Sequence, residues 1–238
     1  GYADRYNILA SLRYEGSSKF GDNHKWGAFP SVSLGWNIMN ESFMKSTKSW
    51  LNNLKLRAGW GITGVIPGSS YLSLLRYSYN GGNYYRNGKW NKGLKAASNP
   101  NPDLKWETAR EFNVGIDWSV FNDRLSGSFD YYNKKTSDML YDYTVPSPPN
   151  LYTTTTANVG EMRNTGFELM IKGVPVQTKN WRWETQATLQ HNSNKLLSLS
   201  NELYQTDNTQ WLQGVGDPVT QYTPVSYTHL RAHETVLD

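Results

Sequence analysis

The chain has 238 residues, and its 24 Lys and Arg residues against 20 Asp and Glu residues give a net charge of +4. The charges are dispersed, without a five-residue basic run or a nucleic-acid-reading motif, so nucleic acid is not an expected partner. Cysteine is absent, which excludes a disulfide framework and thiolate metal sites. The 16 Tyr and 10 Trp residues, in a chain of mean hydropathy −0.67, suit either a membrane–water boundary or a sugar-binding surface.

No stretch approaches about 18 consecutive apolar residues, so the sequence predicts no transmembrane helix. The first residues lack a basic region followed by an apolar run, so no signal peptide is expected. They start within a strand-like pattern. We therefore expect the sequence to be an internal part of a longer chain.

Alternation of apolar and polar residues with a period of two is the dominant pattern, and it predicts seven strands. The apolar face of the first strand consists of Tyr6, Ile8, Ala10, Leu12 and Tyr14. Tyrosines at both ends of an apolar middle are typical of a barrel strand that faces lipid. In chain order, the predicted strands cover residues 5–15, 27–38, 54–63, 111–120, 125–132, 166–172 and 181–190.

The predicted connections alternate between short and long, as they do in outer-membrane barrels with short periplasmic turns and long external loops. The short links are 121–124 and 175–180, and the long links are 16–25, 64–105 and 136–157. The link at 40–53 breaks this rule, and its apolar residues predict a short helix. Alternation alone also fits a soluble β-sandwich, whose sheets have one dry and one wet face. The link lengths favour the barrel, and the alternative is a secreted, soluble β-sandwich that binds glycans.

Five segments carry a more specific signal. They are RYNILASLRYEGSSKFG, WGAFPSVSLGWNI, LNNLKLRAGWGITG, NPDLKWETAREFNVGID and NVGEMRNTGFEL. Together they resemble successive barrel-strand motifs of SusC/RagA-like TonB-linked outer-membrane receptors, in that family's order and at about its spacing. The resemblance covers about residues 1–222.

The resemblance implies a fold, a location and a set of partners. It implies that residues 1–222 are an incomplete, all-β, antiparallel transmembrane segment, with about seven strands of a barrel of about 22. Such receptors lie in the cell outer membrane of Gram-negative, Bacteroidetes-like bacteria and import oligosaccharides or, in some members, peptides. The implied partners are outer-membrane lipid, a SusD-like surface lipoprotein and the TonB complex, which acts through N-terminal parts absent from this chain. The implied protein is not an enzyme and uses no cofactor.

The end of the chain departs from this family. From about Val225 it reads VSYTHLRAHETVLD, which resembles a translated sequencing adapter rather than receptor sequence. We therefore expect residues 223–238 to be a non-native tail.

Two motifs could be mistaken for a nucleotide-binding site or a catalytic site. Residues 59–64 match G-x-G-x-x-G, but they lie within an alternating strand instead of between a strand and a helix, so a nucleotide site is not predicted. Glu107, Glu111 and Asp117 share one face of a predicted strand and could be taken for catalytic carboxylates. Ion pairs with Arg and Lys residues inside a wet barrel are the simpler interpretation. We therefore predict no catalytic residue and no metal site.

The long link at 64–105 carries many rings interleaved with asparagines. Tyr84, Tyr85 and Trp90 lie deepest in it. Flat rings beside amide groups suit sugars, because a pyranose offers C–H faces for stacking and hydroxyls for hydrogen bonds. We predict Tyr84, Tyr85 and Trp90 as ligand contacts. The alternative is that the loop's rings form an outer girdle or pack the loop against its lipoprotein partner.

Overall fold

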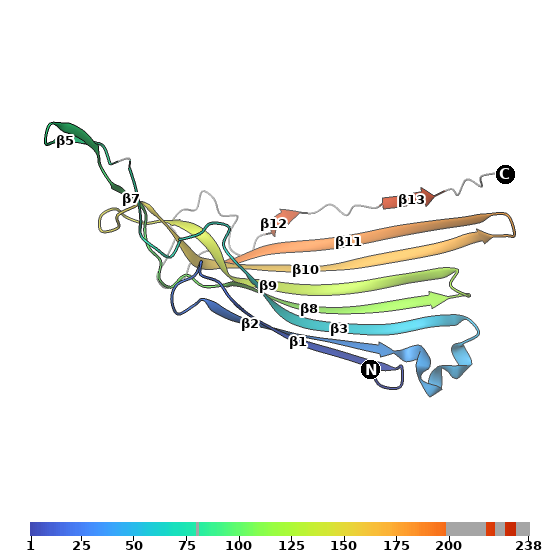
Figure 1. The fold of residues 1–238 in the computed structure, drawn as a ribbon. Coiled ribbons are helices and arrows are strands. Elements are labelled where there is room, and N and C mark those ends of the chain that lie inside the picture. The colour runs from blue at the N-terminus through green and yellow to red at the C-terminus, as the bar shows by residue number, and fades with distance from the viewer. Residues whose placement is uncertain (80, 199–217, 222–226, 232–238) are drawn as a thin grey trace.

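The structure is a computed structural model that describes residues 1–79, 81–198, 218–221 and 227–231. Seven long strands dominate it (Figure 1). They are β1 (Tyr6–Gly16), β2 (Trp26–Asn37), β3 (Leu51–Val65), β8 (Glu107–Val120), β9 (Leu125–Thr144), β10 (Thr154–Gln177) and β11 (Arg182–Ser198). The predicted all-β fold with about seven antiparallel strands is confirmed.

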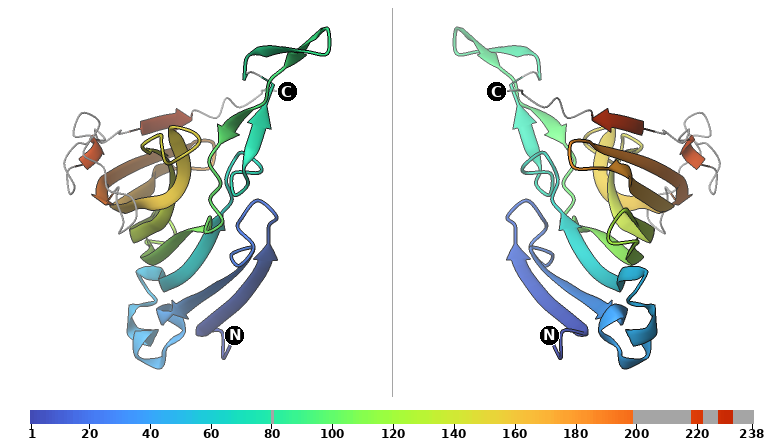
Figure 2. Two further views of the ribbon diagram at one scale, coloured as in Figure 1. Left: turned by 90° about the vertical axis from the view of Figure 1, so that its left-hand side faces the viewer. Right: turned by 90° about the vertical axis from the view of Figure 1, so that its right-hand side faces the viewer.

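The long strands form one sheet in which each strand pairs with the next long strand along the chain, in the order β1-β2-β3-β8-β9-β10-β11. All of these pairings are antiparallel. Two short strands, β12 (Pro218–Gln221) and β13 (Tyr227–Arg231), pair with β11. Among the described residues β1 pairs only with β2, so the sheet is an open, curved wall (Figure 2). The predicted start of a non-native tail at residue 223 lies outside the described residues.

The connections confirm the predicted alternation with one correction. Tight turns at 121–124 and 178–181 lie at one end of the sheet together with the link at 38–50, and the other long links lie at the opposite end (Figure 1). The predicted long link at 136–157 is wrong, because β9 and β10 stay paired as far as Thr144 and Thr154. Only residues 145–153 connect them. The apolar alternation ends before the strands end, because backbone hydrogen bonds continue between residues that do not form an apolar face.

The link between β2 and β3 contains two short 3-10 helices, η1 (Ile38–Asn40) and η2 (Ser42–Thr47), which confirms the short helix predicted there. No helix in the described part of the chain is both long and apolar enough to cross a membrane.

The apolar rows predicted from the sequence lie side by side on one face of the sheet. The pairing register places Ile8 beside Leu34, and Leu34 beside Ala58. The side chains of this row are open to the surroundings, with Ile8 69% and Leu34 49% exposed. Other sheets in the described residues are two-stranded and belong to the loop between β3 and β8. The rows therefore do not form the dry core that the β-sandwich alternative requires.

A carboxylate fixes the helical link against the first hairpin. Glu41 lies between η1 and η2 and is buried. Its side chain accepts hydrogen bonds from Tyr6 Oη at 2.6 Å and Trp36 Nε1 at 3.1 Å, and Arg5 Nη1 lies 3.5 Å away. The hydrogen bond from Tyr6, followed by that from Trp36, holds the pKa of Glu41 below its usual range. The charged carboxylate therefore favours the folded state.

We expect Glu41→Gln to destabilise the folded barrel at neutral pH and to have little effect in acid. In the unfolded chain Glu41 titrates at its ordinary pKa of about 4.3, and in the folded chain the pKa is lower. The stabilisation is therefore fully present above the ordinary pKa and is lost as the pH falls through the folded pKa. Urea unfolding midpoints measured between pH 7 and pH 3 check this.

Asp4→Asn is the matched control at the same end of the sheet. Within the described residues the Asp4 side chain forms no ion pair or hydrogen bond, so its midpoints should follow those of the unsubstituted protein at every pH. A Glu41→Gln protein as stable as the unsubstituted one at pH 7 would contradict the proposed role of Glu41 in fixing the helical link to the first hairpin.

Candidate functional site

Two stacked ring pairs mark the two ends of the apolar band. Tyr6 stacks on Trp36 with ring centroids 6.4 Å apart, and Tyr14 stacks on Trp26 at 5.2 Å. Tyr6 and Tyr14 are eight residues apart on β1, which is about 27 Å along a strand. The apolar band of an outer-membrane barrel is about 25 Å tall and is flanked by aromatic girdles. The first hairpin thus has the dimensions and ring placement of a strand pair that crosses a membrane.

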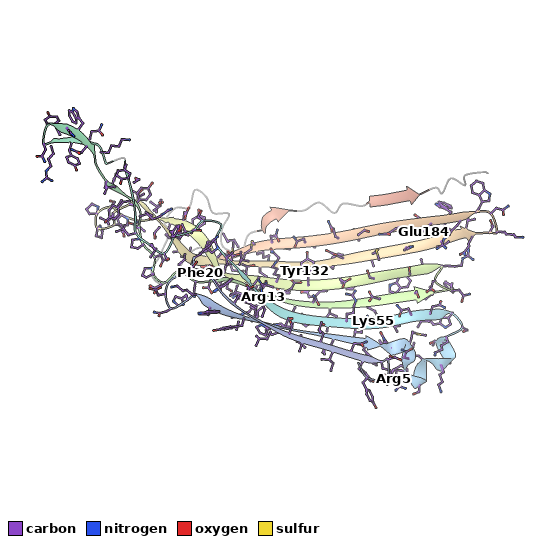
Figure 3. All side chains as sticks on the ribbon, viewed as in Figure 1. Arg5, Arg13, Phe20, Lys55, Tyr132 and Glu184 are labelled. Atoms are coloured by element: carbon purple, nitrogen blue, oxygen red, sulfur yellow. The ribbon has the colours of Figure 1, made fainter. Side chains whose placement is uncertain are left out.

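The opposite face is polar and carries ion pairs. Arg57 on β3 donates from Nε and Nη2 to both carboxylate oxygens of Asp117 on β8, each at 2.8 Å. Arg57 Nη2 also donates to Asp130 on β9 at 3.1 Å. Bidentate guanidinium–carboxylate pairs are directional, so Arg57 ties three neighbouring strands together on this face. Figure 3 labels two other charged side chains of the sheet, Lys55 on β3 and Glu184 on β11.

The predicted ion-pair interpretation of the carboxylates is confirmed for Asp117. Glu111 and Asp117 are six residues apart on β8, or about 20 Å, and Glu107 lies still further along the strand. Carboxylates that act as a catalytic pair lie within about 10 Å of each other. Glu107 instead accepts a hydrogen bond from the backbone N–H of Leu140 at 3.4 Å. In the described part of the chain, no group of three or more His, Asp or Glu residues is placed to hold a metal ion.

The G-x-G-x-x-G match lies within β3, as predicted. A Cβ on Gly59 would lie 2.5 Å from Asn113 Oδ1, and one on Gly64 would overlap the Phe29 ring. These glycines therefore make room for side chains of neighbouring strands. No helix follows them in the described structure.

The link between β3 and β8 is an arm that extends beyond the end of the sheet (Figure 1). Its middle is built from two small hairpins. The hairpin nearer the sheet is formed by β4 (Arg76–Ser78) and β7 (Lys95–Ser98). The outer hairpin is formed by β5 (Asn83–Arg86) and β6 (Lys89–Lys92).

Asparagine side chains fasten the returning base of this arm to the β9–β10 hairpin. Asn99 Nδ2 donates to the carbonyls of Tyr152 and Thr154, at 2.6 and 3.0 Å, and Asn99 Oδ1 accepts from Tyr152 N–H at 3.0 Å. Asn101 Nδ2 donates to the Thr156 carbonyl at 2.8 Å. Prolines follow both asparagines and have no N–H to pair, so amide side chains replace the backbone in this contact. From the other side, Asn158 bonds both the N–H and the carbonyl of Lys105.

An apolar cluster completes this anchor. Phe20 from the β1–β2 link, Phe29 from β2, Leu104 and Trp106 are all buried together. Phe20 lies at the loop end of the sheet, opposite the end that carries Arg5 (Figure 3). The Trp106 ring contacts the rings of Phe20 at 4.7 Å and Phe29 at 5.1 Å. The arm therefore rises from a packed base that joins the β1–β2 link, strand β2 and the β3–β8 link.

The three predicted ligand contacts all lie on the outer hairpin at the end of the arm. Tyr85 and Trp90 are direct cross-strand partners, with ring centroids 5.4 Å apart at 62°. Tyr84 pairs with Asn91 and therefore points to the other face. All three rings are exposed, Trp90 by 73%. The structure thus brings two of the predicted rings together and separates the third.

The asparagine anchor was not predicted. Its signal is present in the sequence, since Asn99 and Asn101 alternate with Pro100 and Pro102 and so share one face of an extended segment. The partner carbonyls belong to residues more than 50 positions away, which local pattern does not reveal.

The structure is a single curved sheet with long loops at one end. One face is apolar and bounded by aromatic rings, and the other is polar and carries ion pairs. These features define the class of the structure, which is a wall segment of a transmembrane β-barrel.

Comparisons with known proteins identify the family. Residues 1–232 match the model for "TonB dependent receptor-like, beta-barrel". The chain is 38% identical to TonB-dependent receptor P39 of Formosa agariphila over 201 residues, 84% of the chain and 19% of that receptor. It is 33% identical to TonB-dependent receptor SusC of Bacteroides thetaiotaomicron over 235 residues, 97% of the chain and 22% of that receptor.

A solved structure of the RagAB peptide importer in the closed-closed state aligns with a TM-score of 0.76 at 32% identity. The alignment covers 89% of this chain and 23% of the importer chain. The chain belongs to the TonB-dependent receptor-like β-barrel family, and it spans about a fifth of the length of these relatives.

The ring pairs set the depth of each residue in the membrane, which makes the cost of a charge predictable. Val32 pairs with Ala10, midway between the two ring pairs on the first hairpin. We expect Val32→Arg to destabilise the complete barrel in lipid by about 2–4 kcal/mol, and Leu34→Arg, one step nearer the Tyr6–Trp36 pair, by less.

Ser33→Arg is the control, because Ser33 lies between these positions in sequence and points to the polar face. Its cost should be far smaller. Unfolding free energies in lipid vesicles measure all three variants, and equal costs at Val32 and Ser33 would refute a lipid-facing row.

The anchor of the arm can be tested by hydrogen exchange. Asn99→Ala removes the acceptor of the Tyr152 N–H, so we expect that amide to exchange about tenfold faster or more, since a lost buried hydrogen bond costs about 1–3 kcal/mol. Asn91→Ala is the control, because the Asn91 side chain bonds only within the outer hairpin among the described residues. Unchanged exchange at Tyr152 in the Asn99→Ala protein would contradict the anchor.

Proposed function

We propose that the protein to which this barrel wall belongs imports oligosaccharides, or peptides, across the outer membrane of a Gram-negative, Bacteroidetes-like bacterium. The observation that carries this proposal is the two-faced sheet. Its apolar face matches a lipid bilayer in height, and its polar face suits a wet interior. Membership of the TonB-dependent receptor-like family supports an energised importer over a passive pore.

Transport in this proposal belongs to the complete receptor. The inner-membrane TonB complex acts on parts of the receptor outside this wall, and the wall holds the shape of the path. Arg57 contributes by cross-linking β3, β8 and β9 on the inner face without covering it. No covalent chemistry is required of the chain.

A SusD-like surface lipoprotein is the proposed partner at the loop end. The anchored arm supports this, because its base is packed and its tip projects beyond the sheet (Figure 1). A firm base and an exposed tip suit contact with something outside the membrane.

Tyr84, Tyr85 and Trp90 are the proposed ligand contacts, with an oligosaccharide favoured over a peptide. Residues 83–92 read NYYRNGKWNK and contain no aliphatic side chain, so they offer rings, amides and cations but no apolar pocket. Exposed ring faces stack on the C–H faces of a pyranose. A second candidate role is contact of the same rings with the lipoprotein, which their exposure also permits.

Import itself is tested in a host that grows on a single oligosaccharide. Deleting the receptor should abolish uptake of the labelled oligosaccharide, restoring it should restore uptake, and a protonophore should stop uptake without releasing bound ligand. Uptake that persists without the receptor, for every oligosaccharide and peptide that the host uses, would refute the proposal.

The ring contacts are tested by Trp90→Ala in the complete receptor. We expect the Kd for the imported oligosaccharide to rise about tenfold, equivalent to about 1.4 kcal/mol of lost stacking. Trp181→Ala is the control, because Trp181 is 75% exposed but lies in the tight turn at the opposite end. Calorimetric titration measures both. Unchanged ligand affinity with weakened lipoprotein binding would favour the second role.

A further inference from the structure

The arm between β3 and β8 carries an excess of positive charge. Residues 58–102 contain no Asp or Glu, and residues 66–102 carry five cations, Arg76, Arg86, Lys89, Lys92 and Lys95. The whole chain has a net charge of only +4, so this one loop accounts for more than the entire excess of positive charge. The rest of the chain is close to neutral.

These cations have no acidic partner in the described fold, although Arg76 Nε donates a hydrogen bond to Ser98 Oγ at 3.4 Å. Among the residues that the structure describes, none of the five forms an ion pair, whereas Lys25 pairs with Asp22 at 2.6 Å and Lys105 with Asp138 at 2.9 Å in the adjoining links. Three of the five lie on the outer hairpin with the rings. An unpaired cluster of one sign on a projecting element attracts a ligand of the opposite sign.

The register places cations and rings on both faces of the outer hairpin. Lys92 lies two residues from Trp90, on the same face, which is about 7 Å along the strand. On the other face, Arg86 and Lys89 are cross-strand partners next to Tyr84. Each face therefore offers a flat ring for a sugar and a cation within one sugar residue of it.

We propose that this hairpin selects anionic glycans, whose sugars carry carboxylate or sulfate groups. The proposal deepens the proposed function by naming a substrate class, and it depends on that function. Stacking on Tyr85 and Trp90 holds the uncharged ring of a sugar, and the cations pair with its acidic groups. A neutral glycan would satisfy the rings and leave the cations unpaired.

Two other anionic occupants fit less well. Lipid headgroup phosphates lie at the edge of the apolar band, near Tyr14 and Trp26, whereas the outer hairpin extends far beyond the sheet (Figure 1). An acidic protein surface would match the cations, but the exposed rings beside amide groups in a segment without aliphatic side chains match a sugar more closely.

The test compares ligands that differ only in charge. The complete receptor in detergent is titrated with oligogalacturonates and their methyl esters, and with sulfated galactan oligosaccharides and their desulfated forms. We expect at least one acidic ligand to bind more tightly than its neutral counterpart. The double variant Lys89→Gln/Lys92→Gln should weaken that ligand about fivefold and leave the neutral form within twofold. Added salt should reduce the difference.

Lys45→Gln/Lys48→Gln is the matched control, since both lysines are exposed and lie in or beside η2 at the opposite end. It should change neither affinity. Neutral glycans or peptides that bind as well as acidic ones would overturn the charge selection and leave the import function standing. Loss of binding to lipopolysaccharide or to the lipoprotein in the double variant, without loss of binding to any acidic glycan, would also overturn it. Failure of all oligosaccharides to bind would count against the glycan ligand itself.

Discussion

Backbone hydrogen bonding in a medium without water is the constraint on which the rest of this structure depends. Inside a bilayer every N–H and C=O group must find a partner within the protein, so only helices and closed sheets can span it. The seven long strands pair in an antiparallel series from β1 to β11, and among the described residues the outer edge of β1 has no paired strand. Pairing between successive strands keeps the tight turns at one end and frees the other end for long links.

Side-chain chemistry then follows from the two surroundings of the wall. The face in contact with lipid needs aliphatic residues between two levels of rings, and Tyr6–Trp36 with Tyr14–Trp26 supply those levels. The inner face needs groups that tolerate water and hold neighbouring strands, and the Arg57 cluster supplies them. Glu41 connects one ring pair to the helical link, because its carboxylate accepts hydrogen bonds from both Tyr6 and Trp36. The loop end extends beyond the apolar band, so its sequence is free of these two requirements.

The arm combines a fixed base with an exposed tip. Its base is fixed by amide side chains that act in place of a backbone strand and by a small buried cluster of rings. Its tip keeps rings and cations exposed. In the proposed binding role, a firm base would limit the conformational freedom that a ligand must remove on binding.

The sequence by itself determined the sheet, its strands, the two faces and the family, because a period of two and the ring positions are local properties that survive in any register. It also placed Tyr84, Tyr85 and Trp90 in one loop. Only the tertiary structure decided that Tyr85 and Trp90 meet while Tyr84 faces away, that β9 and β10 continue to Thr144 and Thr154, and that Asn99 bonds to Tyr152. These features depend on pairing between distant segments, and polar residues can continue a paired strand without leaving an alternating signal in the chain.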